Sequence, residues 1–262
     1  MTILFHELRR GRAAFVVWTG VIAFMIIICM ALFPEMKEQM AGVNALFANM
    51  GSFTAAFGMD QVSFGEVMGF YAIECGNILG LGGAFYAALL GISALAKEEK
   101  EHTAEFLLAH PIARFSVIMQ KLSAVFVQLL VMNLLIAAVA AVSFQMIGES
   151  MKTEEFLLLH GAFLVMQIEI AGICFGISAY IRSSGLGIGL GLAAVMYFLN
   201  IIANISDQAD ILRYVTPFAY AEASDIVAEC NIDGRLMGLG ILYMAAALTA
   251  GVVYYRKKDI AV

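Results

Sequence analysis

Residues 13–33 read AAFVVWTGVIAFMIIICMALF, a run of 21 residues with no acidic or basic side chain. A helix needs about 20 apolar residues to cross a hydrocarbon core ~30 Å thick, so this run predicts a membrane-spanning helix. The whole composition agrees, because 62% of the residues are hydrophobic and 14% are charged, where soluble domains carry about a quarter charged residues. The mean hydropathy is +0.88. We therefore expect an all-α membrane protein.

Further apolar runs of similar length follow the first one along the chain. The six predicted spans cover residues 13–33, 67–96, 115–147, 156–181, 185–206 and 236–255. Two longer outer segments, 34–66 and 207–235, mix apolar and charged residues, and we expect short helices in both. Neither is long enough to fold by itself, so residues 1–262 are predicted to form one transmembrane domain. Alternating segments of about ten residues, which would indicate a β-barrel, are absent from the sequence.

Lysine and arginine are distributed unevenly along the chain. If the N-terminus faces the cytoplasm, the cytoplasmic side holds Arg9, Arg10, Arg12, Lys97, Lys100, Arg114, Lys121, Arg182, Arg256, Lys257 and Lys258. The outer side holds only Lys37, Lys152, Arg213 and Arg235. This positive-inside asymmetry predicts that both termini and the 97–114 loop are cytoplasmic. Ahead of the first span, the mixture of apolar and charged side chains in residues 3–10 predicts a short elbow helix in the inner membrane interface.

Two carboxylates, Glu74 and Glu169, lie within predicted spans. Glu74 is near the outer end of its span, where a side chain can reach the interface without having any function; the other interpretation is a place in a substrate path or polar interior. Glu169 is near the middle of the fourth span, where a charge costs at least ~2.5 kcal/mol on insertion scales. Glu169 is therefore protonated, paired or facing a polar cavity. Two interpretations remain open for it: a place in a substrate path or polar interior, and a purely structural, hydrogen-bonded acid.

Motifs of enzyme chemistry are absent from the sequence. It contains no His-Glu-x-x-His, no Gly-x-Ser-x-Gly and no Gly-x-x-x-x-Gly-Lys-Ser/Thr, so we do not expect the chain itself to hydrolyse ATP. The four cysteines lack metal-ligand spacing, so neither a metal nor a cofactor is expected in this chain. Glycines four residues apart at 76 and 80, 172 and 176, and 187 and 191 predict close helix packing rather than a phosphate loop.

The loop between the second and third predicted spans reads KEEKEHTAEFLLAHPIAR over residues 97–114. Thr103 can cap a short helix, Glu105 suits the positive N-terminal end of that helix, and Pro111 ends it. Phe106 and Leu107 would then form an apolar face with a charged rim, which is typical of a small docking site. The alternative is a solvated loop whose charges only set the topology.

These residues resemble the first cytoplasmic loop of ATP-binding-cassette exporter permeases of the second integral-membrane type, which have the type-five exporter fold. That family shows a glutamate cluster, then Gly-Thr-x-Glu-x-Leu-Leu-x-x-Pro-x-x-Arg, then a lysine that opens the next span. The matching positions here are Thr103, Glu105, Leu107, Leu108, Pro111, Arg114 and Lys121, while His102 replaces the glycine. Residues 7–10 resemble the elbow helix of the family, and residues 216–218, Thr-Pro-Phe, resemble its Ser-Pro-Phe motif.

The resemblance implies a permease subunit of an ATP-driven exporter in the cell membrane of a bacterium. The implied partners are a separate ATPase subunit that binds ATP and magnesium, a second or related permease, and membrane lipid, with no nucleic acid. The implied contacts with the ATPase come from Glu98, Glu101, Thr103, Glu105, Phe106, Leu107, Leu108, Pro111 and Arg114. The very apolar spans favour a hydrophobic or amphipathic substrate, such as a drug, peptide or lipid. Two alternatives are a secondary transporter or channel that uses Glu169, and a membrane immunity or assembly factor without transport.

Overall fold

The computed structural model describes residues 2–47, 51–59, 61–100, 113–181 and 185–258, and these residues form helices and connecting turns with no strand. Six helical stretches are long and apolar enough to cross a membrane. They are α1 (Thr2–Phe47), the succession of α3 (Val67–Phe70), η1 (Tyr71–Cys75) and α4 (Gly76–Lys100), then α6 (Arg114–Met146), α7 (Thr153–Ser178), α8 (Leu186–Ile205) and α10 (Gly234–Lys257). The predicted all-α membrane protein with six spans is thus confirmed.

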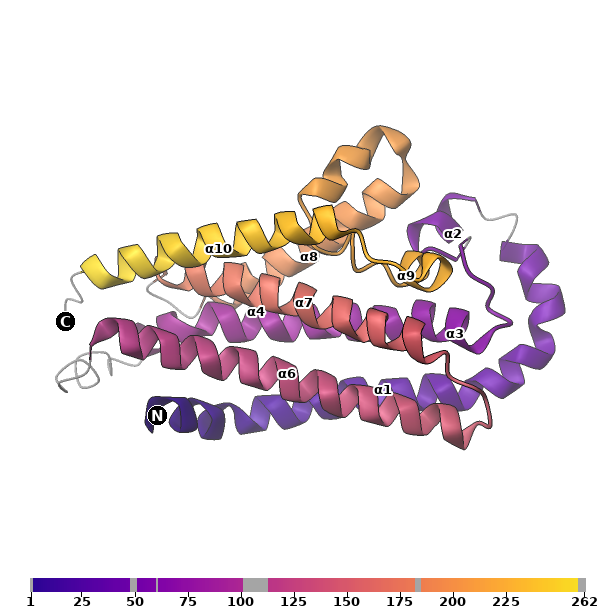
Figure 1. The fold of residues 1–262 in the computed structure, drawn as a ribbon, viewed down its shortest axis with the longest axis horizontal. Helices are drawn as coiled ribbons and strands as arrows, with labels where there is room; N and C mark the ends of the chain where they lie inside the picture. The colour runs from indigo at the N-terminus through magenta and orange to yellow at the C-terminus, as the bar shows by residue number, and fades with distance from the viewer. Residues whose placement is uncertain (1, 48–50, 60, 101–112, 182–184, 259–262) are drawn as a thin grey trace.

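Helix α7 occupies the middle of the bundle. It packs against α4 on one side and α10 on another, and it also contacts α6. Helix α1 lies against α6 and α4, and α8 lies against α4. Helices α1, α4, α6, α7 and α10 run along the long axis of the molecule (Figure 1). Side chains on α7 are therefore the ones most enclosed by protein.

Glycines bring α7 close to its neighbours, as their spacing predicts. A methyl group on Gly176 would lie 2.2 Å from the Ala247 carbonyl oxygen of α10, and one on Gly80 would lie 3.1 Å from the Phe163 ring of α7. The third predicted pair behaves differently, because Gly187 and Gly191 of α8 have no described atom within 4 Å of an added methyl. Close packing within this chain thus explains glycines on α4 and α7 but not these two.

The N-terminal residues continue directly into α1 instead of forming a separate elbow helix. Helix α1 is unbroken from Thr2 to Phe47, well beyond the predicted span at residues 13–33, and Pro34 lies inside it. Residues 2–12 contain no proline, so nothing in the backbone interrupts the helix there. Beyond the span, the far end of α1 bends away from the bundle axis (Figure 1). A helix containing proline loses a backbone hydrogen bond, which permits such a bend.

The two ends of the bundle differ in composition. The start of α1, the ends of α4 and α10 and the start of α6 share one end, which we call the basic end (Figure 1). Short elements cover the opposite end: α2 (Ser52–Ala56), the 3₁₀ helix η2 (Asp207–Tyr214) and α9 (Ala223–Glu229). The chain between η2 and α9 is buried, with Thr216, Phe218 and Tyr220 each less than 9% exposed. Residues 216–223 therefore form part of the bundle interior.

Candidate functional site

The predicted docking loop falls mostly outside the described residues. The predicted contact residues that lie outside the described ranges are Glu101, Thr103, Glu105, Phe106, Leu107, Leu108 and Pro111. Glu98 lies in the last turn of α4, where only the backbone is described, and Arg114 is the first residue of α6. The structure therefore shows the two helix ends from which this loop leaves the bundle.

Arg114 ties the start of α6 to the C-terminal end of the chain. Its Nη1 donates hydrogen bonds to the backbone oxygens of Lys258, at 2.8 Å, and Arg256, at 3.4 Å. The Lys258 ammonium in turn donates to the Ala179 carbonyl oxygen just beyond α7, at 3.1 Å. Arg114 is thus part of a connection between α6, α10 and α7 at the basic end.

Lys121 makes a second connection at this end, about two turns further along α6. Its side chain is 2% exposed, and its Nζ lies 3.0 Å from the Glu7 Oε1 of α1 and 2.9 Å from the Ala94 carbonyl oxygen of α4. We call these three groups the Lys121 clamp. A buried ammonium requires such acceptors because desolvating an unpaired charge is costly. The clamp therefore holds α1 and both helices that flank the docking loop.

A cavity of about 160 Å³ adjoins the Lys121 clamp. Glu7 and Arg10 of α1, Ser93 of α4, and Lys121 and Gln128 of α6 contribute its polar lining. From the sequence alone, Lys121 is predicted only to be a basic residue at the start of a span. A lysine enclosed by an apolar run needs a carboxylate partner, and this rule could have directed attention to Glu7, the acidic residue ahead of the first span.

Glu169 lies on α7 with its side chain fully buried. Neither carboxyl oxygen accepts a hydrogen bond from the described residues, although the Tyr220 hydroxyl lies close by without reaching hydrogen-bond geometry. Burial and the nearby Glu169 carboxyl raise the pKa of Tyr220, so its hydroxyl keeps its proton. Gly240 of α10 makes room for the acid, since a methyl group there would lie 2.1 Å from Oε2. These surroundings suit an uncharged carboxylic acid.

Gln167 lies two residues before Glu169 and therefore faces the opposite side of α7. Its Oε1 accepts a hydrogen bond of 2.7 Å from the Asn133 amide of α6, and its Nε2 donates one of 3.3 Å to the Leu79 carbonyl oxygen of α4. All three groups are buried. Sequence reasoning missed this network because each amide stands alone in an apolar run, and only the packing of three helices brings them together.

Glu74 is placed apart from Glu169, and the described residues show no interaction between the two. Glu74 is half-buried in η1, a π-helical turn of the second span. In the same turn, the Tyr71 hydroxyl is hydrogen-bonded to His160 Nε2 of α7 at 2.8 Å. The described residues therefore show no direct contact between the two intramembrane carboxylates.

Metal binding finds no support within the described ranges, where no three His, Cys, Asp or Glu side chains gather closely enough to hold an ion.

A family model described as "ABC-2 family transporter protein" matches residues 1–260 of the chain. No curated protein matches it. The family match therefore covers all six membrane helices and the docking loop.

Proposed function

Because the chain belongs to the ABC-2 family of transporter proteins, we propose that it is the permease subunit of an ATP-driven exporter. In this proposal it works as a dimer with a second copy or a related permease, and a separate ATPase subunit supplies the energy. The family match over residues 1–260 carries the proposal, and the six apolar helices agree with it. ATP and magnesium would be bound by the ATPase rather than by this chain.

The basic end would face the cytoplasm and the ATPase. Excess lysine and arginine on one side of the membrane favours that side as the cytoplasmic one. The loop that follows Lys100 would insert Phe106 and Leu107 into a pocket of the ATPase. The Lys121 clamp supports this role, because the ammonium holds α1, α4 and α6 together where the loop leaves the bundle. A push on the loop would therefore move three helices together.

The substrate path would lie between two permeases and would accept a hydrophobic or amphipathic molecule. ATP binding would shift the pair between inward-facing and outward-facing states by favouring one of them. Glu169 would enter the path in one of these states. Its buried position beside Gly240 and residues 216–223 supports this, because a small movement of α10 would open the carboxyl to its surroundings.

The docking role is tested by replacing both Phe106 and Leu107 with aspartate. The double variant should insert normally but lose the ATPase subunit, since each buried anchor contributes on the order of 2 kcal/mol to an interface. Phe5→Asp is a matched control, because Phe5 is an exposed apolar residue at the same end of the bundle. Co-purification of the ATPase should fall for the double variant and persist for the control. Equal recovery of the ATPase with both variants would refute the docking role.

The role of Glu169 is tested with two substitutions. Glu169→Gln keeps the volume and polarity of the neutral acid, whereas Glu169→Leu removes both hydrogen-bonding groups. If the carboxyl lines the path, both variants should assemble with the ATPase and transport slowly. Normal transport by both variants in a folded complex would leave Glu169 a structural residue.

One observation favours a second candidate function. A buried carboxyl without a partner, such as Glu169, is the kind of group that carries protons in secondary transporters. Transport by the purified chain alone, driven by a proton gradient in vesicles without ATP, would support that alternative. Transport that requires both the ATPase and ATP would exclude it.

A further inference from the structure

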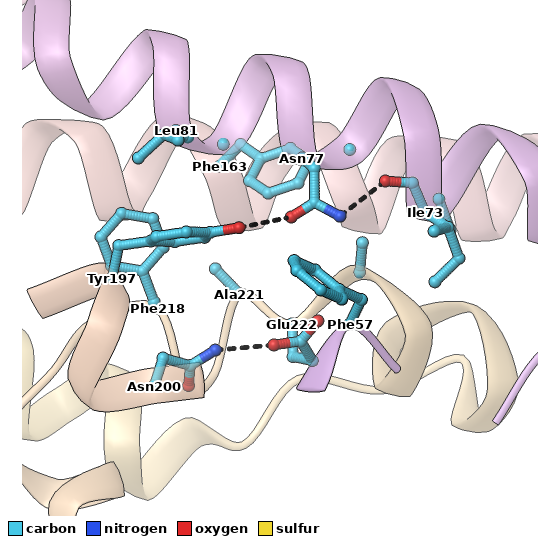
Figure 2. Close-up of a pocket in the computed structure, with 14 residues that line it drawn as sticks. Phe57, Ile73, Asn77, Leu81, Phe163, Tyr197, Asn200, Phe218, Ala221 and Glu222 are labelled. Atoms are coloured by element: carbon cyan, nitrogen blue, oxygen red, sulfur yellow. Dashed lines mark hydrogen bonds between the residues drawn. The ribbon is translucent and has the colours of Figure 1, made fainter. Parts of the chain in front are cut away.

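A small cavity lies at the end of the bundle opposite the basic end, where α4, α7 and α8 meet the chain just before α9. Its volume is about 30 Å³. Figure 2 shows Glu222 and Asn200 on one side of this cavity and Asn77 with Tyr197 on the other. A cavity needs at least about 10–15 Å³ to hold one water molecule, so this one accommodates a group of two or three non-hydrogen atoms.

Glu222 supplies a carboxylate without a bonded cation. Asn200 Nδ2 donates to its Oε2 at 2.7 Å, and Asn204 Nδ2 donates to the same oxygen at 3.0 Å. Both amides engage Oε2, so neither of them engages Oε1. None of the ion pairs among the described residues includes Glu222, and Arg213 is paired with Asp210 at 3.1 Å. Arg213 donates a hydrogen bond to Asn204 Oδ1 at 3.4 Å, and its positive charge lowers the pKa of Glu222 without an ion pair between the two side chains.

Each donor group around the cavity already makes one hydrogen bond within the protein. Asn77 Nδ2 donates to the Ile73 carbonyl oxygen at 2.7 Å, and the Tyr197 hydroxyl donates to Asn77 Oδ1 at 3.3 Å (Figure 2). The Asn200 amide is committed to Glu222. The amide oxygen of the same side chain differs: Asn200 is 4% exposed, and its Oδ1 accepts no hydrogen bond from the described residues. A wall whose donor groups each hold an internal partner, and whose Asn200 Oδ1 acceptor stays open, suits a ligand that donates hydrogen bonds.

Aromatic rings complete the wall. Phe57, Phe163 and Phe218 line the cavity together with the Tyr197 ring. The face of an aromatic ring attracts a cation and disfavours an anion. A protonated amine meets all three conditions, because it is positively charged, has three N–H donors and carries no acceptor. Its small size also fits, whereas a trimethylammonium group has more atoms than the cavity holds.

We propose that this cavity binds the primary ammonium group of an amphipathic molecule, through the Glu222 carboxylate and the Asn200 amide oxygen. The ammonium could belong to a lipid headgroup or to a transported amine, and the chemistry of recognition is the same. Burial raises the pKa of Glu222 above its ordinary value, although hydrogen bonds from the Asn204 and Asn200 amides oppose this; a cation bound beside the carboxyl would favour its ionised form. The proposal rests on the proposed function only where the ammonium belongs to a substrate.

Binding is measured with the purified chain in nanodiscs of phosphatidylcholine, without any ATPase. The probes are octylamine, octyltrimethylammonium and octan-1-ol, which share one apolar chain and differ in charge and N–H donors. Octylamine should bind at least tenfold more tightly than either of the others. Equal affinity for octylamine and octyltrimethylammonium would overturn the proposal, and this comparison uses the unaltered protein.

A pair of variants locates the binding. Glu222→Gln removes the charge but keeps an acceptor for the two asparagine amides, and it should weaken octylamine binding at least tenfold. Glu229→Gln removes a negative charge from the exposed last residue of α9, outside the cavity lining, and should leave binding unchanged. Unchanged octylamine affinity in Glu222→Gln would overturn the proposal.

The source of the ammonium is identified by changing the lipid. If nanodiscs with phosphatidylethanolamine weaken octylamine binding by competition, the site serves a lipid headgroup. If they leave it unchanged, the ammonium belongs to a substrate. The binding assay contains no ATPase, so it is independent of the exporter proposal. If the exporter proposal fails, the unaltered protein will not co-purify with an ATPase subunit, while its binding of octylamine persists.

Discussion

Removing one member of the Lys121 clamp at a time should show that its ion pair acts as a unit. Glu7→Gln removes the Glu7 carboxylate from beside the Lys121 ammonium, which is 2% exposed, and Lys121→Met removes the cation from beside Glu7. The two consequences differ because Glu7 is 19% exposed and Lys121 is 2% exposed, so bulk water reaches the carboxylate more readily than the ammonium. Losing one partner of a fully buried ion pair costs about 3–5 kcal/mol, and the partial exposure of Glu7 reduces this. We therefore expect Glu7→Gln to lower the free energy of unfolding by about 2 kcal/mol, because a hydrogen bond to a charged group contributes about that much.

The expected cost of Lys121→Met is smaller, about 1 kcal/mol, since it removes the buried charge and keeps the apolar stem, and the Ala94 carbonyl oxygen loses one donor. The double variant should cost about as much as Lys121→Met alone, since the ammonium that the Glu7 carboxylate stabilises is already absent. This gives a coupling energy of about 2 kcal/mol in a double-mutant cycle, well above the ~0.3–0.5 kcal/mol scatter of independent sites.

The assay is equilibrium unfolding of the purified chain in mild detergent, followed by tryptophan fluorescence and circular dichroism. The exposed ion pair between Lys37 and Glu149, at 2.5 Å, is the control, with side chains that are 47% and 27% exposed. Its cycle should give a coupling energy of about 0–1 kcal/mol. Additive effects of Glu7→Gln and Lys121→Met would refute the reasoning, because they would mean that the two charges do not stabilise each other.

Two further predictions concern packing and topology. Gly176→Ala places a methyl group 2.2 Å from the Ala247 carbonyl oxygen and should destabilise the protein by about 1–3 kcal/mol in thermal unfolding. The control is Gly161→Ala, whose added methyl has no described atom within 4 Å and should not destabilise the protein. Equal stability of the two variants would contradict the close contact at Gly176. In a cysteine-free background, single cysteines at residues 100 and 258 should react with impermeant reagents only from the cytoplasm, and one at residue 150 only from outside; labelling of residue 100 in intact cells would reverse the topology.

Part of the fold follows from the sequence because it depends on local properties. A helix crosses the membrane if its own residues are apolar over a sufficient length, so run lengths predict six spans without knowledge of their neighbours. Helix ends are harder to place from such runs. The predicted first span ends at residue 33, but α1 continues to Phe47, because polar residues beyond Pro34 can extend a helix into water as well as end it.

The candidate sites were predictable to a smaller extent. The apolar and charged residues at 97–114 indicate a docking loop on their own, because the pattern is contiguous. Glu169 stands out for the same reason, since one acid in an apolar run is conspicuous. Its neighbours were not predictable, because Tyr220 and Gly240 come from later segments that fold back against α7.

Hydropathy and charge along the chain thus set the helical class, the number of spans and the favoured orientation, since each depends on residues close together in sequence. Tertiary structure alone pairs Lys121 with Glu7, 114 residues earlier, and Glu222 with Asn200 on a different element. The physical reason is that a buried polar group must find its partner in space. Many arrangements of six apolar helices bury the same surface, and these polar contacts distinguish the one that the protein adopts.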